Sequence, residues 1–329
     1  MSDHIRFSAT LGRDIRTADD VRALGVTTEK LAGDALRAGD LEAAARWTAY
    51  FAQEPRWIMA FYRPWIESLL ALGRREVASF EQDLSRLTDL IGVPPPLPDA
   101  GSVGAAEEEV AVAAAAAGDE EAFDAAIEGL KRVQWKVHDD QGDWLWGLFT
   151  VLHRELGEDR MEREVFREPV APIAAERFAA LASLTQYEKF EFSIDLMRGH
   201  FCGPSDEAHI DVVETDDRWV MSFDPCGSGG RMRRGDPIRE QRPRTEPPFN
   251  FAHAERAHPW TWGRENVCLY CAHCSFVNEI LPIERTGIPL RVTDYPEAPG
   301  DQCRWTVYKD PRMIPEDVYR RVGKSKPTS

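Results

Sequence analysis

The chain has 329 residues, with 56 acidic and 40 basic side chains and a formal net charge of −16. This length is enough for two or three structural units, because globular domains usually have about 100–200 residues. The acidic balance argues against nucleic acid and anionic membranes as partners, since both repel negative charge. No apolar stretch approaches the roughly 18–20 residues that span a bilayer, and the N-terminus lacks the apolar segment of a signal peptide. We therefore expect a cytoplasmic protein.

The first 187 residues have the three- and four-residue spacing of apolar side chains that is typical of helices. Within them, Gly39-Asp40 and Gly118-Asp119 stand in similar surroundings, and in each pair the Gly can end one helix while the Asp caps the next. We predict a duplicated helical unit, with repeat 1 in residues 1–93 and repeat 2 in residues 105–187. The Pro/Gly-rich stretch 94–104 is unable to continue a helix and is predicted to be the linker.

The pattern changes near residue 188, where Phe190, Phe192, Ile194 and Leu196 alternate with polar residues. A two-residue repeat predicts a half-buried strand, so we expect a sheet to begin here.

Alternation on both sides of Asp216-Asp217 predicts an antiparallel hairpin, and two more strands are expected around Val292 and from Cys303 to Val307. A helix is expected at about 272–281, ended by Pro282. The fold class is thus predicted to be α+β: a duplicated all-helical N-terminal region packed on an antiparallel-sheet domain, residues 188–329, that carries a cysteine-rich metal site.

Five of the six cysteines lie at or after position 226. Cys271 and Cys274 form a Cys-x-x-Cys pair, a spacing that lets two thiolates bind one ion, and Cys226 and Cys303 lie at predicted strand ends. We predict a four-sulfur site from these cysteines, with zinc as the leading metal. Iron or an iron–sulfur cluster is the alternative, because Cys268 extends the pair to a triplet. Burial of Cys226 and Cys303 as small apolar residues also stays open.

The segment from about 225 to 264 is rich in Gly, Pro and Arg, and is predicted to be a binding loop or lid. Its glycines leave backbone amides free, so Ser228, Gly229 and Arg231 are candidates for holding an anionic substrate, with Trp260 and Trp262 beside them. A glycine-rich turn with solvated arginines is an equally good interpretation.

Three residues are candidates for proton transfer: His273, which lies between two predicted ligands, and the acids Glu265 and Glu279. His200 and His209 flank Cys202 and would form a second ligand set only if the loop brought them together. His138 and Asp139 lie among aromatic residues, which is typical of a ligand pocket between helices but more often of a core with a polar edge. We favour the second interpretation.

The segment Arg291-Val-Thr-Asp-Tyr, followed by Gly300-Asp301-Gln-Cys303-Arg-Trp305, resembles the closing strands of the 4-vinyl reductase domain and of 2-amino-thiazoline-4-carboxylate hydrolase-like proteins. The resemblance covers about the last 40–60 residues and implies a small-molecule domain, a sensor or a hydrolase, in which Cys303 contributes to a zinc site. Trp305 departs from the Phe usual at that position, and the helical region has no counterpart in the pattern.

These observations predict a metal-dependent enzyme, with zinc as cofactor, that hydrolyses a small anionic molecule. A second hypothesis is a small-molecule-binding or sensor protein in which zinc is structural. A third is cysteine chemistry without metal, with Cys226 as a nucleophile favoured by loop amides and Arg231, or an iron–sulfur redox protein.

Overall fold

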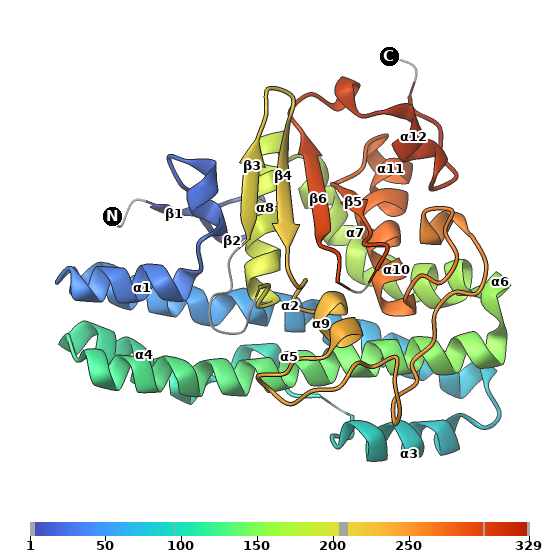
Figure 1. Cartoon of the computed structure of the whole chain (residues 1–329), viewed down its shortest axis with the longest axis horizontal. Coiled ribbons are helices and arrows are strands. Elements are labelled where there is room, and N and C mark those ends of the chain that lie inside the picture. The colour runs from blue at the N-terminus through green and yellow to red at the C-terminus, as the bar shows by residue number, and fades with distance from the viewer. Residues whose placement is uncertain (1–3, 96, 204–209, 299, 328–329) are drawn as a thin grey trace.

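The computed structural model describes residues 4–95, 97–203, 210–298 and 300–327, and it gives residues 174–179 through their backbone only. A helical N-terminal region is followed by a four-stranded antiparallel sheet (Figure 1). The α+β class is therefore confirmed.

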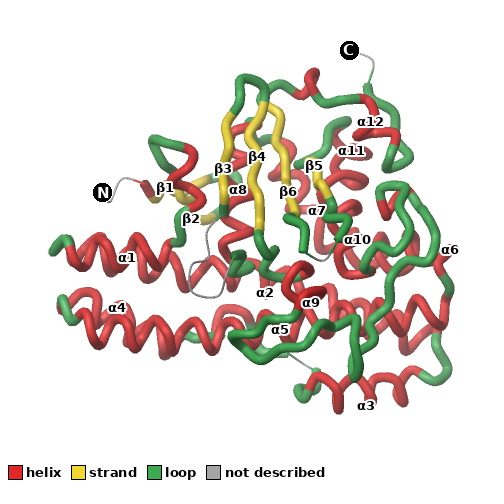
Figure 2. The backbone as a smooth tube through the Cα atoms, viewed as in Figure 1, coloured by secondary structure: helices red, strands yellow, loops and turns green. Residues whose placement is uncertain are grey.

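Two helical hairpins form the N-terminal region: α1 (Thr28–Arg37) with α2 (Leu41–Glu76), and α4 (Ala105–Ala117) with α5 (Glu120–Leu156). Asp40 accepts a hydrogen bond from the backbone N–H of Ala43 at the start of α2, and Asp119 accepts one from Ala122 at the start of α5. The preceding Gly39 and Gly118 have φ of 78° and 74°, a left-handed conformation that glycine adopts without strain. Both Gly-Asp pairs thus end and cap helices as predicted, and Figure 2 shows the hairpins as a layer beneath the sheet.

The rest of the helical region consists of shorter elements. An antiparallel strand pair that the helical pattern did not predict, β1 (Ile5–Ser8) and β2 (Arg13–Arg16), precedes α1. Helix α3 (Phe80–Ile91) follows α2, and the described part of the stretch 94–104 is irregular apart from a 3-10 turn at Ala100–Ser102. After α5 come α6 (Glu158–Arg160), a π-helical segment (Met161–Arg167), α7 (Glu168–Ala182) and α8 (Gln186–Gly199).

The predicted strand at 188–196 is wrong, because these residues form α8. Thr185 and Glu188 make a capping box that starts this helix. The helix lies between the bundle and the sheet, and its apolar face packs on strand residues. Its residues Glu191 and Asp195 are buried and accept hydrogen bonds from arginines of the β1–β2 strand pair. Both faces are covered, so alternating apolar and polar residues do not indicate a strand here.

The sheet has the order β3-β4-β6-β5 and is antiparallel throughout. Its strands are β3 (Asp211–Glu214), β4 (Arg218–Phe223), β5 (Val292–Asp294) and β6 (Cys303–Tyr308). The predicted hairpin across Asp216-Asp217 and the two later strands are confirmed. Phe223 pairs with Cys303, so the end of β4 lies beside the start of β6.

Helices α9 (Gly229–Arg234), α10 (Leu269–Ser275), α11 (Leu281–Thr286) and α12 (Glu316–Arg320) complete the chain. A π-helical segment, Phe276–Ile280, joins α10 to α11. Pro282 lies in the first turn of α11 and the helix continues to Thr286, so the predicted end at Pro282 is wrong. The helical backbone is continuous at this junction, since the N–H of Leu281 donates to the carbonyl of Phe276 in the π-helical segment.

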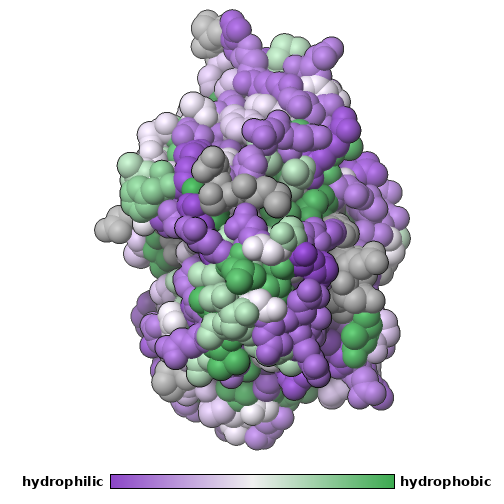
Figure 3. Space-filling view, turned by 90° about the vertical axis from the view of Figure 1, so that its left-hand side faces the viewer, coloured by the Kyte–Doolittle hydropathy of each residue, from purple (hydrophilic) through white to green (hydrophobic). Residues whose placement is uncertain are grey.

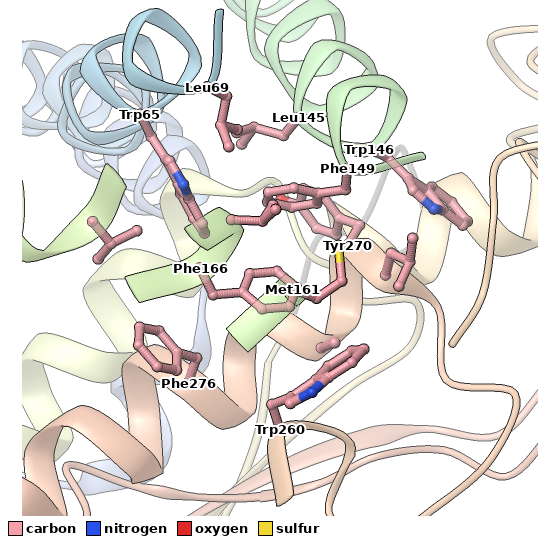
Figure 4. Packing of buried hydrophobic residues seen from close by; sticks show 14 of the residues in the cluster. Trp65, Leu69, Leu145, Trp146, Phe149, Met161, Phe166, Trp260, Tyr270 and Phe276 are labelled. Atoms are coloured by element: carbon pink, nitrogen blue, oxygen red, sulfur yellow. The ribbon is translucent and has the colours of Figure 1, made fainter. Parts of the chain in front are cut away.

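The bundle and the C-terminal helices share one core. Figure 4 shows Trp65 of α2 and Phe149 of α5 facing Tyr270 of α10 and Phe276, with Phe166 and Trp260 beside them. This packing fixes α10, which carries two of the predicted metal ligands, against the long helices. Figure 3 shows a face that is mainly hydrophilic with hydrophobic residues gathered near its centre. None of the described helices has both the length and the apolar character needed to cross a membrane.

Candidate functional site

The four cysteines of the predicted metal site line one small cavity of about 30 Å³, which we call the thiol cavity. Cys226 follows β4, Cys271 and Cys274 belong to α10, and Cys303 begins β6. The pairing of β4 with β6 and the packing of α10 bring together residues that are up to 77 positions apart (303 − 226). Cys268 does not line this cavity: its sulfur caps α10, accepting from the backbone N–H of Cys271 at 3.4 Å.

The thiols do not form a preassembled coordination set. Within the described ranges of the chain, no three side chains of His, Cys, Asp or Glu are grouped so that they could hold a metal ion. The donors are of the type that zinc or iron prefers, and they line one cavity, but a metal would require the side chains to move toward one another.

Cys226 differs from its neighbours in its ionisation. A hydrogen bond from the Cys202 thiol and backbone N–H groups of Gly230 and Ser228 lower the pKa of Cys226 to about 5, although burial opposes the shift. By contrast, burial raises the pKa of Cys202, Cys274 and Cys303. Cys226 is thus the natural thiolate among them.

The backbone around Cys226 explains this environment. A side chain at Gly227 would place its Cβ 1.7 Å from the carbonyl oxygen of His200, so only glycine lets the loop approach α8 so closely. The N–H of Gly227 donates to the Cys202 sulfur at 3.2 Å, and the hydroxyl of Ser228 lies 3.6 Å from the Cys226 sulfur. The glycines of the Asp-Pro-Cys-Gly-Ser-Gly-Gly sequence therefore permit close approach to a thiolate.

A larger pocket of about 450 Å³ adjoins the thiol cavity, and we call it the apolar pocket. It lies where α2, α7, α8 and α10 meet β6. Cys226, Ser228, Cys274 and Trp305 line both spaces. Its size is in the range of small-molecule sites, roughly 300–1,000 Å³. Six of its large apolar wall residues are Trp57, Phe61, Leu181, Phe192, Leu196 and Leu290.

Arg291 is the exceptional residue of the apolar pocket. Its side chain is buried, with the guanidinium 3.8 Å from the centre of the Trp305 ring, and Nη1 donates to Ser193 Oγ at 3.1 Å. Its Nε has no hydrogen-bond partner, and no ion pair joins Arg291 to any residue in the described part of the chain. Burial lowers its pKa to about 9, so the group is still a cation at neutral pH.

A chain of three side chains, the buried His138 and the half-buried Asp139 and His200, leads from the bundle to the apolar pocket. His138 Nδ1 lies 3.0 Å from Asp139 Oδ1, and His138 Nε2 lies 2.9 Å from His200 Nδ1. Burial opposes ionisation of Asp139, but the hydrogen bond from His138 and the charge of Arg231 outweigh it and hold the pKa of Asp139 well below its usual range. Burial also lowers the pKa of His200, which is therefore neutral.

These contacts fix the direction of the first hydrogen bond. An ionised carboxylate only accepts, so His138 Nδ1 carries a proton and donates to Asp139. In the tautomer in which His138 Nε2 accepts from His200 Nδ1, a lone pair is left on His200 Nε2. Since His200 lines the apolar pocket, the chain Asp139-His138-His200 in this tautomer supplies a proton acceptor to it.

Several predicted substrate-binding residues have other partners. Arg231 forms ion pairs with Asp139 at 3.7 Å and Asp236 at 3.5 Å, donates to the carbonyl of Phe201, and lines neither space. Its role as an anion anchor therefore has no support in the geometry. Trp260 is part of the core, whereas Ser228, Gly229 and Trp262 line the thiol cavity.

The three candidates for proton transfer are in different surroundings. His273 lines the apolar pocket, donates from Nδ1 to the Tyr270 carbonyl, and has a pKa lowered by burial to about 4. Glu279 is buried between Trp262, Thr293 and Arg321, in a structural ion pair of 3.0 Å. Glu265 is exposed and lines neither space. Of the three, only His273 is placed to act there.

Tyr62 and Arg291 are pocket residues to which sequence reasoning assigned no role, and His200 was considered only as a metal ligand. The Tyr62 and Tyr270 hydroxyls share a hydrogen bond beside Ser228. The suggested partner of His200, His209, lies outside the described residues, and its actual partner is His138, 62 positions away. Separations of this kind leave no signal in one sequence. No known protein family model matches the chain, nor does any curated protein or solved structure.

Proposed function

We propose that the protein is an enzyme that hydrolyses a small anionic molecule in the apolar pocket, with Cys226 as the nucleophile. The observation that carries this proposal is the position of Cys226: it lines both spaces, and Cys202 and two backbone N–H groups hydrogen-bond to its sulfur. A lowered thiol pKa and a nearby base are what nucleophilic cysteine chemistry requires.

In the proposed reaction the Cys226 thiolate attacks the carbonyl carbon of an activated ester or thioester. The bond from that carbon to the leaving group breaks, and the leaving group departs as an anion. Water then attacks the resulting thioester and gives a proton to His200 Nε2, and the acid and the Cys226 thiolate are released. The protonated His200 passes this proton to the leaving-group anion, so one water is consumed for each substrate and both residues return to their starting states.

The test is hydrolysis of mono-4-nitrophenyl esters of short dicarboxylic acids, which carry an anionic group and report release of 4-nitrophenol. We expect an acyl adduct on Cys226 in the mass spectrum of rapidly quenched protein, and loss of turnover by about a hundredfold or more in Cys226→Ala. The matched control is Cys268→Ala, which removes a buried thiol that lines neither space. Turnover in Cys226→Ala equal to that of the unmodified protein would exclude the nucleophile.

A second candidate is favoured by the four thiols that line the thiol cavity. In this proposal Cys226, Cys271, Cys274 and Cys303 hold zinc, or alternatively iron or an iron–sulfur cluster, and the metal ties the loop after β4 to α10 and β6. Elemental analysis separates the two proposals. Less than about a tenth of an equivalent of zinc or iron, unchanged in Cys271→Ser and Cys303→Ser, excludes the metal site and leaves the nucleophile.

A further inference from the structure

The apolar pocket has no carboxylate in its wall. None of the described residues that line it is Asp or Glu, whereas two of them, Arg13 and Arg291, are arginines. The one anionic group among these described residues is the Cys226 thiolate, whose hydrogen bonds come from Cys202 and the loop backbone. Arg13 is already paired, since its Nη1 lies 2.8 Å from Asp195 Oδ2. Arg291 has only a hydroxyl and a ring face as partners. In a protein of net charge −16, an unpaired buried cation at a pocket wall is unusual.

Physical chemistry makes such a residue unfavourable unless something else satisfies it. Taking a charged group out of water is costly, and stacking on an aromatic ring returns only part of that cost. No carboxylate in the described part of the chain forms an ion pair with Arg291. A ligand anion would be the missing partner.

We infer that the apolar pocket binds a carboxylate carried on an apolar, preferably aromatic, body, and that Arg291 is its anchor. The inference shares its pocket with the proposed hydrolysis and gives that reaction its substrate class, but binding does not depend on Cys226.

The chemistry favours a single carboxylate over a phosphate. One unpaired guanidinium matches one negative charge, and its planar fork matches the two oxygens of a carboxylate. A phosphate carries nearly two charges and is usually held by several donors, whereas the other pocket arginine is occupied by Asp195. The aromatic walls Trp57, Phe61 and Phe192 provide flat apolar surface for the rest of the ligand.

One more unpaired donor lies in the same wall. Trp305 Nε1 is buried and has no hydrogen-bond partner, and Trp305 lines the apolar pocket. Buried polar groups are almost always satisfied, so this N–H and Arg291 Nε are two donors without an acceptor in one pocket wall. A carboxylate supplies acceptors only, which matches donors of this kind.

The test is a matched pair of probes, 2-naphthoate and 2-naphthamide, which have the same aromatic frame and differ in charge. Isothermal titration calorimetry on the full chain is expected to show 2-naphthoate binding about tenfold to a hundredfold more tightly than the amide. In Arg291→Met this preference disappears. In Arg291→Lys, which keeps the charge and loses the fork, it is reduced. The control Arg304→Met removes an exposed arginine from the same strand as Trp305 and leaves binding unchanged.

The proposal is overturned if the unmodified protein binds both probes equally. It is overturned too if 2-naphthoate shows no binding at concentrations up to the millimolar range. It is also overturned if Arg291→Met, shown by circular dichroism to be folded, binds 2-naphthoate as the unmodified protein does. Cys226→Ser separates the two proposals, because it is expected to lose hydrolysis and to keep the 2-naphthoate affinity. Binding without hydrolysis in the unmodified protein would remove the proposed reaction and keep the carboxylate site.

Discussion

Two buried arginines lie in different regions of the molecule and differ in whether a carboxylate balances their charge. Arg198, at the junction of α8 with α2, is 3% exposed in its side chain, has its Nε 2.6 Å from Glu54, and also pairs with Asp195. Arg291, in the wall of the apolar pocket, is similarly buried and has no carboxylate partner among the described residues. At the junction each buried arginine charge is balanced by carboxylates of the protein, and these ion pairs stabilise the fold. In the pocket, the charge of Arg291 is balanced only when a ligand supplies an anion.

The largest effect that this comparison predicts is at Asp195. Its carboxylate accepts hydrogen bonds from Tyr50 and Arg13 and pairs with Arg198. Asp195→Asn therefore removes the negative charge that faces both arginines. We expect the free energy of unfolding to fall by about 3–5 kcal/mol, measured by chemical denaturation. The control is Glu81→Gln at an exposed ion pair with Arg74, which is expected to lose less than about 1 kcal/mol. Equal losses would show that the junction is not a structural charge cluster.

The second effect concerns the thiolate that faces the pocket. With a pKa of about 5, Cys226 is deprotonated above that pH, so its alkylation by iodoacetamide should rise through pH 5 and level off well below neutrality. Burial raises the pKa of Cys303, which should react only in strongly alkaline solution. Peptide mapping after alkylation at pH 6 compares the two directly.

Removal of the donor tests the cause of this reactivity. The hydrogen bond from Cys202 contributes most to the shift, so Cys202→Ala should move the midpoint of Cys226 alkylation to higher pH. Because the folded state lowers the pKa of Cys226, the thiolate adds to the free energy of unfolding at pH values above that pKa. This contribution is expected to be lost as the pH falls toward 5. An alkylation midpoint of Cys226 near that of an ordinary thiol would contradict the proposal.

A smaller effect is expected in the histidine chain. In the unmodified protein His200 Nε2 should be unprotonated, because Asp139 orients His138 and His138 orients His200. Long-range proton–nitrogen NMR correlations identify this tautomer. Asp139→Ala removes the orienting charge, and we expect a mixture of tautomers at His200. A protonated Nε2 in the unmodified protein would exclude His200 as a proton acceptor.

The smallest predicted change is at Arg291 in the absence of ligand. Because this cation lacks a counter-ion, Arg291→Met should change the free energy of unfolding by less than about 1 kcal/mol, or raise it. Thermal and chemical denaturation of the ligand-free variant measure the change. A loss comparable to that of Asp195→Asn would reveal a partner for Arg291 within the chain and would remove the contrast between the two arginines.

Local chemistry predicted a large part of the fold. The capping of α2 and α5 by Asp40 and Asp119 depends on residues within three positions, and the hairpin across Asp216-Asp217 depends on a two-residue alternation. The same alternation failed at α8, because that helix is covered on both faces and its polar residues are buried. The spacing of apolar residues predicts the type of element when one face is buried and the other is exposed. It gives a wrong prediction where both faces are covered.

The candidate site was predictable only in its cysteines. Cys226, Cys271, Cys274 and Cys303 are named by residue type and spacing, and the structure places them around one cavity. The geometry gives no support to Arg231 as anion anchor, because Asp139 of α5 and Asp236, five positions further along the chain, already pair with it. Whether an arginine is free depends on which carboxylates the fold brings within a few ångströms.

The sequence by itself therefore determined the helical hairpins, the four strands of the main sheet and the cysteines that gather where β4 ends and β6 begins, because capping, alternation and residue chemistry are local. Only the tertiary structure decided that Arg231 is paired and Arg291 is not, that Cys226 is the acidified thiol, and that His138 directs His200 toward the pocket. Charge pairing and hydrogen-bond direction arise between residues distant in the chain, and burial decides how much each one matters.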